Sequence, residues 1–420
     1  MLRLVSLGGL FVVLLLCFLA SSNRRAIKWR LVGTGLLIQA ILGVTFLYWQ
    51  DGNAALRGVG HGVSNFLGLA TRGTNFVWGS LSDGASMERV FGPGKAFVFA
   101  IMVLPTLIFF SSFMAVLYHL GIMQALVRVM AAVMVRVMGT SGSESMSACA
   151  NIFVGQTEAP LLVKPFLPRM TKSELHAIMV GGFATIAGGV FVLYTSFGVD
   201  PGHLMVASVM AAPAGLVCSK LAFPETEASE TMGKVVRSVE RTSSNVVEAA
   251  ANGAIDGLQL ALNVGAMLIA FLGLVAVIDW ALAGVSSGLV GSTLSEPLSL
   301  GKVLAWAFSP LAAVMGASFD GKQILALGEL LGTKLALTEL VAYARLGEIK
   351  QDLSPRTVMI ASFALCGFAN FASVAIQIGG LGAMAPERRK DLASLGVRAM
   401  LIGALATCMT ACLAGVLARV

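Results

Sequence analysis

Two short stretches of the chain place a threonine–glutamate pair inside apolar sequence. One is GQTEAP at residues 155–160 and the other is LTELVAY at residues 337–343. A carboxylate at bilayer depth costs at least about 2.5 kcal/mol, so it must serve a partner or a substrate. Both pairs lie in segments that are too interrupted to be plain spanning helices. This combination predicts a transporter whose binding site lies between two matched, broken segments.

Further polar side chains accompany these glutamates. Gln156 and Thr157 directly precede Glu158, and Pro160 follows it and ends regular helix there. The stretch CGFANFAS at residues 366–373 adds a ring, an amide and a hydroxyl, which belong to Phe368, Asn370 and Ser373. Together with the carboxylates, these groups suit a neutral ligand that has a flat ring and several hydroxyls. A single Gln, Thr, Asn or Ser in a membrane helix also serves as an interhelical hydrogen-bonding group, and that alternative stays open here.

The composition is that of an integral membrane protein. Hydrophobic residues make up 57% of the 420 residues, charged residues make up 12%, and the mean hydropathy is +0.85. Soluble domains carry about 25% charged residues, so a soluble fold is excluded. The net charge of +7 resides in short basic connections, and no basic run with interleaved aromatics predicts nucleic-acid binding. The six cysteines lie in or beside apolar stretches without a CxxC pair, which predicts buried thiols rather than disulfides.

Hydropathy predicts an all-α fold with eight transmembrane helices. The predicted spans are residues 2–20, 31–50, 95–121, 174–198, 201–222, 257–285, 356–383 and 391–418. Residues 140–170 and 301–350 contain the two Thr-Glu pairs and are predicted to form re-entrant helical hairpins, because irregular backbone at membrane depth must line a cavity. Residues 52–93 are predicted to hold an interfacial amphipathic helix, whose apolar face comprises Leu56, Val59, Val63, Phe66 and Ala70.

Basic residues set the predicted orientation. One threading places the four most basic regions on the cytoplasmic side; these are residues 21–30, 122–173, 219–250 and 386–391. Both termini then lie outside, the first hairpin enters from the cytoplasm, and the second enters from outside. Each hairpin is followed by two spans, which is the arrangement of an inverted repeat. Because the basic cluster follows the first apolar run instead of preceding it, that run is predicted to be a retained span and not a cleaved signal.

This arrangement predicts four parts of the chain. Residues 1–138 hold the first three spans and the interfacial helix, and they are largely scaffold. Residues 139–222 form a first transport repeat, made of the first hairpin and spans four and five. Residues 223–300, a polar loop and span six, return to the scaffold, and residues 301–420 form a second transport repeat. Glu174 and His176 fall at a predicted membrane edge and are expected to be solvated.

Several of these motifs together point to a known family. GQTEAP, the segment NVVEAAANGAIDGLQLALNV at 245–264, LTELVAY and CGFANFAS resemble the concentrative nucleoside transporters in order and spacing, over roughly residues 95–418. The resemblance implies a homotrimer in a bacterial inner membrane, with eight spans, an interfacial helix and two opposed hairpins per subunit. It also implies cation-coupled uptake of nucleosides such as uridine, by an elevator-like movement of a transport domain against a scaffold.

The resemblance also implies residue roles. Contacts to the nucleobase side would come from Gln156, Thr157, Glu158, Val190 and Phe368. The ribose would be held by Glu339, Asn370 and Ser373. A sodium ion would be bound by the side chains of Asn151 and Thr185 and by backbone oxygens of Val154 and Ile186, which agrees with the preference of a hard cation for oxygen ligands.

Two positions depart from the family pattern. Thr338 stands where the family commonly has Asn, and Thr185 stands where it often has Ser. The function predicted is sodium-coupled import of neutral nucleosides. Two alternatives stay open, namely proton-coupled nucleoside transport and an intramembrane enzyme that uses paired carboxylates. No HExxH, GxSxG or Walker pattern supports the enzyme.

Overall fold

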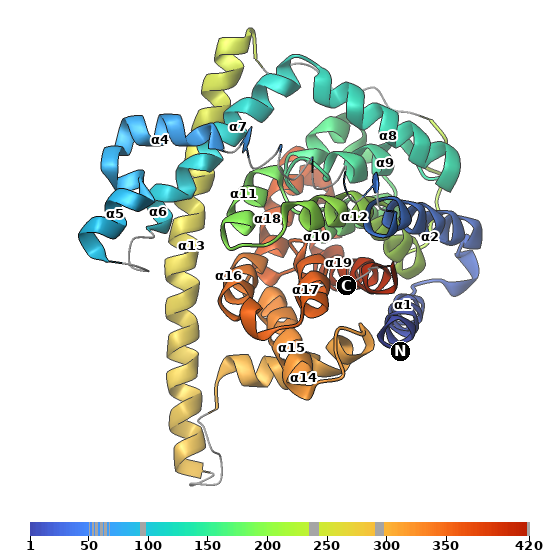
Figure 1. Cartoon of the computed structure of the whole chain (residues 1–420). Coiled ribbons are helices and arrows are strands. Elements are labelled where there is room, and N and C mark those ends of the chain that lie inside the picture. Colours follow the sequence, from blue (N-terminus) through green and yellow to red (C-terminus); the bar gives the residue numbers. More distant parts are fainter. Residues whose placement is uncertain are drawn as a thin grey trace.

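The computed structural model describes residues 1–49, 51, 52, 54, 58, 62, 65, 66, 68–92, 98–234, 243–289 and 298–417. Over these residues the chain folds into helices, joined by short turns, with one isolated β-bridge between Ser141 and Met232. Figure 1 shows a main bundle of helices with one long helix, α13, running along its side. The predicted all-α fold is confirmed.

Eight crossings can be counted in the described part of the chain. Six are continuous and apolar, at Leu2–Leu19 (α1), Trp29–Tyr48 (α2, Trp29–Gly43, with a π-helical end), Phe99–His119 (α6, Phe99–Met102, and α7, Leu104–His119), Pro201–Ala222 (α12), Val246–Leu289 (α13) and Arg389–Leu417 (α19). Two are broken in the middle, at Lys172–Ala184 with Gly188–Ser196 (α10 and α11) and at Pro355–Leu365 with Phe371–Met384 (α17 and α18). Short 3₁₀ turns lie at Arg24–Ala26, Lys350–Asp352 and Pro386–Arg388.

The two broken helices meet at their breaks. The backbone N–H of Phe368, between α17 and α18, donates to the carbonyl oxygen of Thr185, between α10 and α11, at 3.2 Å. Gly367 permits this approach, because a Cβ there would lie 2.6 Å from the carbonyl oxygen of Phe183. A glycine is therefore needed at this break because the two backbones touch there.

Both hairpins are present. The first has a helical arm, Gly142–Ala150 (α9), a tip at 151–158 and a 3₁₀ arm, Ala159–Arg169, in which Pro165 and Pro168 remove the N–H groups that an α-helix needs. The second is formed by Gly321–Ala336 (α15) and Glu339–Ile349 (α16). Its predicted range of 301–350 was too wide, because Leu300–Val314 is a separate helix, α14, that packs along α15.

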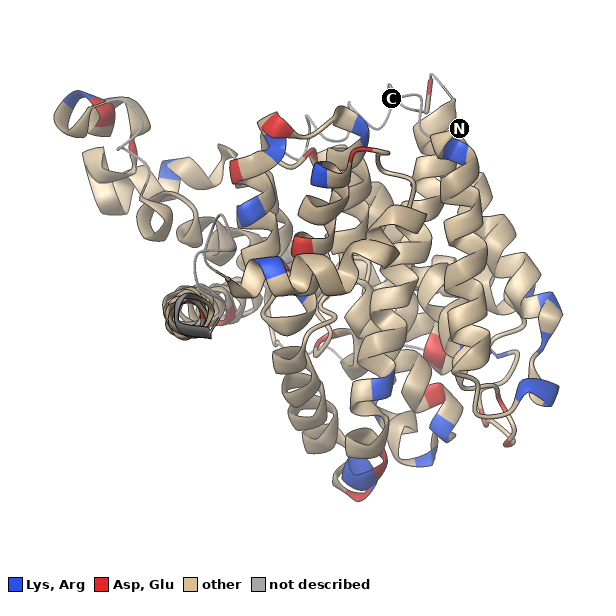
Figure 2. Cartoon of the chain, turned by 90° about the horizontal axis from the view of Figure 1, so that it is seen from below, with Lys and Arg blue, Asp and Glu red and all other residues tan. Residues whose placement is uncertain are grey.

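The two halves follow the same order of elements. A lone helix comes first (Ile122–Met138, α8, or α14), then a hairpin, a broken helix and a continuous helix. The continuous helix of the second half, α19, packs against α10 and α12 of the first half and against α17 and α18 of its own. The two repeats therefore share one core. The start of α1 and the end of α19 lie at the same end of the bundle, as an even number of crossings requires (Figure 2).

α13 differs most from its prediction. The predicted span six, 257–285, is enclosed by a helix of 44 residues, which at 1.5 Å per residue is about 66 Å long. A bilayer core is about 30 Å thick, so such a helix has to cross it at a steep tilt. Figure 2 shows α13 end-on at the left while α1 stands upright, so the two run in very different directions. α13 packs along α7, and a Cβ at Gly253 or Gly257 would collide with that helix.

The predicted interfacial helix falls partly outside the described residues. Leu56, Val59 and Val63 belong to the part that is not described. Phe66 packs on Phe109 and Phe113 of α7, with ring centroids 5.1 and 4.5 Å apart. Ala70 is buried at the start of α4 (Ala70–Trp78), which is followed by a 3₁₀ turn, Gly79–Ser82, and by α5 (Gly84–Phe91). The apolar face therefore packs on a spanning helix where it is described.

Candidate functional site

One part of the candidate site is a set of hydrogen bonds around Glu339. Thr338 caps α16 by accepting a hydrogen bond from the N–H of Val341, which fixes Glu339 as the first residue of that helix. The phenol of Tyr194 donates to Oε1 of Glu339 at 3.0 Å, and the amide of Asn370 donates to Oε2 at 2.9 Å. Glu339 is only 5% exposed. Its carboxylate is thus held in one orientation by neighbours from two broken helices.

From Asn370 the contacts continue to the first hairpin. The Oδ1 of Asn370 caps α18 by accepting from the N–H of Ser373 at 2.9 Å, and the Oγ of Ser373 accepts from the amide of Gln156 at 3.2 Å. The amide of Gln377 then donates to Oε1 of Gln156 at 3.0 Å and to the carbonyl of Met179 at 3.1 Å. One chain of hydrogen bonds therefore joins the second hairpin, the break before α18 and the tip of the first hairpin.

Glu158 is placed differently from Glu339. Its side chain is exposed and lines a cleft, and the neighbouring Gly155 leaves room for the carboxylate to fold back over the backbone. The first hairpin enters the hydrogen-bond chain through Gln156, while Thr157 packs its methyl group toward Gly380. Glu158 is thus open to the cleft, whereas Glu339 is enclosed. Among the described residues, neither carboxylate forms an ion pair with Lys or Arg.

The two apolar candidates lie at the helix breaks. Val190 is 6% exposed in the first turns of α11, and Phe368 is half-buried in the break before α18. Both pack against the apolar core that surrounds the hydrogen-bond chain. The structure therefore brings all eight predicted substrate residues to the two breaks and the two hairpin tips.

Two of the predicted sodium ligands, Asn151 and Thr185, both lie against Gly181. Both side-chain polar atoms of Asn151 are fully buried and have no hydrogen-bond partner. The Thr185 hydroxyl donates to the carbonyl of Gly181 at 2.8 Å, which leaves its oxygen free to accept, and Gly181 packs directly under Asn151. Val154 and Ile186 follow these residues closely along the chain. An unsatisfied buried amide beside a hydroxyl and backbone oxygens fits a small hard cation.

Three buried polar residues were missed by the sequence reasoning. Tyr194 holds Glu339 and stacks on Tyr343, Gln377 holds Gln156, and Lys334 donates to the carbonyl of Ala364 at 2.8 Å and to Oγ1 of Thr407 at 2.9 Å. Gln377 carried a signal, because it lies one helical turn after Ser373 in an otherwise apolar helix. The partners of Tyr194 and Lys334 come from distant parts of the chain, so no local pattern marks these two residues.

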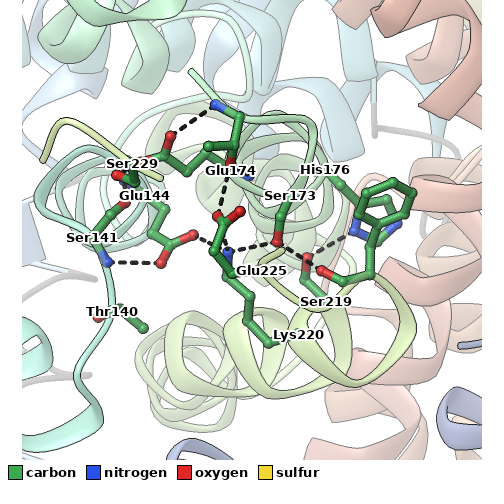
Figure 3. Close-up of polar contacts among 12 residues, drawn as sticks. Thr140, Ser141, Glu144, Ser173, Glu174, His176, Ser219, Lys220, Glu225 and Ser229 are labelled. Carbon is green, nitrogen blue, oxygen red and sulfur yellow. Dashed lines mark hydrogen bonds and ion pairs between the residues drawn. The ribbon is translucent and has the colours of Figure 1, made fainter. Parts of the chain in front are cut away.

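A second buried polar cluster lies at the base of the first hairpin (Figure 3). Lys220 pairs with Glu144 at 2.6 Å and with Glu225 at 3.6 Å, and all three side chains are at most 6% exposed. Glu174 accepts from Ser229 at 2.6 Å, Ser143 at 3.0 Å and Thr231 at 3.3 Å. The expectation that Glu174 and His176 are solvated was wrong, since they are 2% and 0% exposed. The segment 223–232 folds back over them, which hydropathy does not reveal.

Comparison with known proteins decides the family. A model described as the C-terminus of Na⁺-dependent nucleoside transporters matches residues 203–415, the corresponding N-terminal model matches 8–81, and a nucleoside recognition model matches 100–200. An uncharacterized transporter of Haemophilus influenzae is 46% identical over 98% of this chain and 97% of its own length. The chain belongs to the Na⁺-dependent nucleoside transporter family. It is therefore a multi-pass membrane transporter, and the family's coupling ion is sodium.

Members of this family with described activities are also similar. The mouse sodium/nucleoside cotransporter 1 is 40% identical over 99% of this chain, which spans 64% of that protein's length. The transporter CNTnw, solved in an inward-facing substrate-bound state, matches with a TM-score of 0.93 at 43% identity over 99% of this chain and 98% of its own. A variant of CNTnw in an outward-facing state matches with a TM-score of 0.92. The family fold, with its opposed hairpins, is thus shared along the whole chain.

Proposed function

We propose that the chain imports neutral nucleosides such as uridine, together with sodium, and releases them chemically unchanged. One observation carries this proposal. The hydrogen-bond chain from Glu339 through Asn370 and Ser373 to Gln156 supplies donors and acceptors at a depth where the surroundings are apolar. Such a chain suits a ligand with several hydroxyls and no charge. An anionic ligand would meet Glu339 and Glu158 unfavourably.

In this proposal the two hairpins bind opposite parts of the nucleoside. Glu339 and Asn370 take the ribose hydroxyls, because a carboxylate accepts paired hydrogen bonds from neighbouring hydroxyls, and Ser373 supports them. On the base side, a ring stacks on Phe368 beside Val190 and bonds to the tip residues Gln156, Thr157 and Glu158. Thr338, where the family commonly has Asn, acts as a helix cap and leaves the ribose contacts to Glu339.

Sodium is the second substrate in this proposal. Asn151 and Thr185 would bind it through side-chain oxygens, and Val154 and Ile186 would bind it through their carbonyl groups. The unsatisfied amide of Asn151 supports this assignment. The ion would order the tip of the first hairpin and so raise nucleoside affinity, and the nucleoside must raise sodium affinity by the same factor.

The driving force follows from charge. A nucleoside is neutral, so one sodium ion carries one positive charge inward. This is worth about 2.3 kcal/mol per 100 mV, which corresponds to roughly 50-fold accumulation, before any sodium gradient is added.

We propose an elevator-type movement for alternating access. Residues 139–222 and 301–420 would move as the transport domain, while 1–138 and 223–300 would form the scaffold. The packing of α10, α12, α17 and α18 on α19 supports a moving unit built from both repeats. The cleft between the first hairpin and the α7–α13 pair supports a boundary there.

Location and assembly complete the proposal. We propose that the chain lies in a bacterial inner membrane with both termini outside, and the distribution of its basic regions supports this orientation. Three copies would associate through scaffold surfaces. Only 12% of the residues in the most apolar window of α13 are buried, and its exposed apolar side chains include Ile255, Leu258, Leu262, Ile269 and Leu272. A homotrimer would cover part of this face.

The test is uptake of labelled uridine into proteoliposomes that contain the purified protein. Replacing sodium by choline at fixed pH is expected to abolish concentrative uptake, and the uridine recovered inside is expected to be intact. Uptake that survives without sodium but follows an inward pH gradient would assign the coupling to protons. A hydrolysed or phosphorylated product would point to an enzyme.

A further inference from the structure

A cleft of about 720 Å³ separates the first hairpin from the α7–α13 pair. Small-molecule sites are typically about 300–1,000 Å³ in volume, so the cleft can hold a ligand of nucleoside size. Glu158 and Gly155 lie in its hairpin wall. Lys164 and Ser243, which also line it, belong to the basic regions that the proposed orientation places on the cytoplasmic side. The cleft therefore leads from the hairpin tip toward the cytoplasm.

The opposite wall carries two polar side chains in an apolar helix. Asn252 and Asp256 are one helical turn apart on α13, both are exposed, and both line the cleft. Asp256 and Glu158 line the same cleft, Asp256 from α13 and Glu158 from the first hairpin. A carboxylate that faced lipid at this position would be costly in free energy. This cost explains why Asp256 lines the cleft. Gly253 and Gly257, which directly follow Asn252 and Asp256, pack tightly against α7.

Further unsatisfied polar atoms surround the end of the cleft. The phenol oxygen of Tyr118, Nδ1 of His119 and Oε1 of Gln124 are buried without a hydrogen-bond partner, and all three residues line the cleft. The amide nitrogen of Gln124 donates to the carbonyl of Tyr118, so its oxygen is the free end. Buried polar atoms normally have partners, and a ligand in the cleft could supply them after small side-chain rotations.

We propose that the α7–α13 wall is a second, weaker nucleoside site, which receives the substrate when it leaves the hairpin tips. Asp256 accepts from the ribose hydroxyls, Asn252 both donates and accepts, and Tyr118, His119 and Gln124 bond to the far end of the ligand. The mixture of donors and acceptors on this wall, from the amides of Asn252 and Gln124, the phenol of Tyr118 and the imidazole of His119, suits a neutral, hydroxyl-rich ligand. The inference rests on the proposed function for the identity of the ligand.

This site predicts a difference between the two faces of the membrane. It lies on the cytoplasmic side of the hairpin tip, so its loss weakens the capture of nucleoside from that side alone. The test compares uridine influx and uridine efflux in proteoliposomes of one known protein orientation. The test variant is Asn252→Ala with Asp256→Asn. The matched control is Gln259→Ala, which removes a polar side chain from α13 that does not line the cleft.

The double variant is expected to raise the half-saturating uridine concentration for efflux about tenfold. The half-saturating uridine concentration for influx and the sodium dependence of influx should stay as in wild type. Equilibrium binding of uridine to purified protein adds a second readout. Wild type is expected to show a tight and a weak component, Glu339→Gln loses the tight one, and the double variant loses the weak one.

The proposal would be overturned if the half-saturating uridine concentration for efflux did not change. Equal changes in that concentration for efflux and influx would also overturn it. If the double variant does not fold, Tyr118→Phe with Gln124→Ala is expected to give the same asymmetry at smaller size, and a symmetric result with that pair would also overturn it. Failure of the proposed function would look different, because wild type itself would neither bind nor transport uridine.

Discussion

Two polar regions of the first hairpin, one at its base and one at its tip, obey opposite rules. At the hairpin's base, Lys220, Glu144 and Glu174 are enclosed, and ion pairs or hydroxyl groups satisfy them. At its tip, Glu158 lines a cleft without an ion pair, and the amide of Asn151 has no partner. A polar group whose partners come from the chain holds the structure together. A polar group without a partner requires one that the chain itself does not supply. The comparison separates architecture from function within a single hairpin.

The largest effect is expected from the base of the hairpin. Lys220→Met leaves Glu144 and Glu225 buried without their counter-charge, and it should lower the free energy of unfolding by about 3–5 kcal/mol. Chemical denaturation in mixed micelles measures this loss. Adding Glu144→Gln to the same chain should recover part of it. Arg345→Met, which breaks an exposed pair with Glu329, is the control and should cost about 1 kcal/mol or less.

At the tip region, Glu339→Gln should mainly damage ribose recognition. The change weakens two hydrogen bonds to a charged acceptor, each worth about 1.5–3 kcal/mol, so uridine binding should fall about 100-fold. Competition against labelled uridine measures it. 2′- and 3′-deoxyuridine should lose less, since they already lack a hydroxyl. Equal losses for all three ligands would reject the ribose assignment.

Asn151→Ala should remove the coupling between ion and substrate. In wild type, sodium is expected to raise uridine affinity by a factor within the usual range for coupled sites, about 5–150-fold. In the variant, the affinities measured with sodium and with choline should converge near the choline value of wild type. A sodium effect of wild-type size would place the ion elsewhere. Ser145→Ala, beside the hydroxyl of Thr140 rather than near Asn151, serves as a control.

Glu158→Gln should have a smaller effect than Glu339→Gln, because Glu158 is open to the cleft. An expected loss of about tenfold in uridine affinity corresponds to one hydrogen bond of about 1.4 kcal/mol. Uridine and its deoxy derivatives should lose equally, in contrast to Glu339→Gln. The readout is the same competition panel, and Glu227→Gln on the exposed loop is the control.

The smallest effect is expected from Ser229→Ala. It removes the 2.6 Å hydrogen bond to Glu174, but two other hydroxyls still donate to that carboxylate, so stability should fall by about 1 kcal/mol. Uridine uptake per folded molecule should match wild type. A loss of uptake without a loss of stability would show that the base of the hairpin takes part in transport.

Particular residues show where sequence reasoning succeeded. The Thr-Glu pairs and the CGFANFAS stretch fell at hairpin tips and helix breaks. They could be found from the sequence because clustered polar side chains are rare in plain spanning helices. Gln377 could have been found in the same way. Lys334 and Tyr194 could not, because a single buried Lys or Tyr is explained only by partners that lie far away in the sequence.

The sequence alone determined that this is a membrane transporter with two opposed, broken segments, because the cost of polar groups in lipid marks every exception to an apolar helix. It also supplied the predicted side chains for the ligand and the ion. Tertiary structure decided which of them are already satisfied. It enclosed Glu339 and left Glu158 open, buried Glu174 and His176 under a returning loop, and tilted a 44-residue helix across the bundle. These outcomes depend on contacts between distant segments, and hydropathy reports only on local ones.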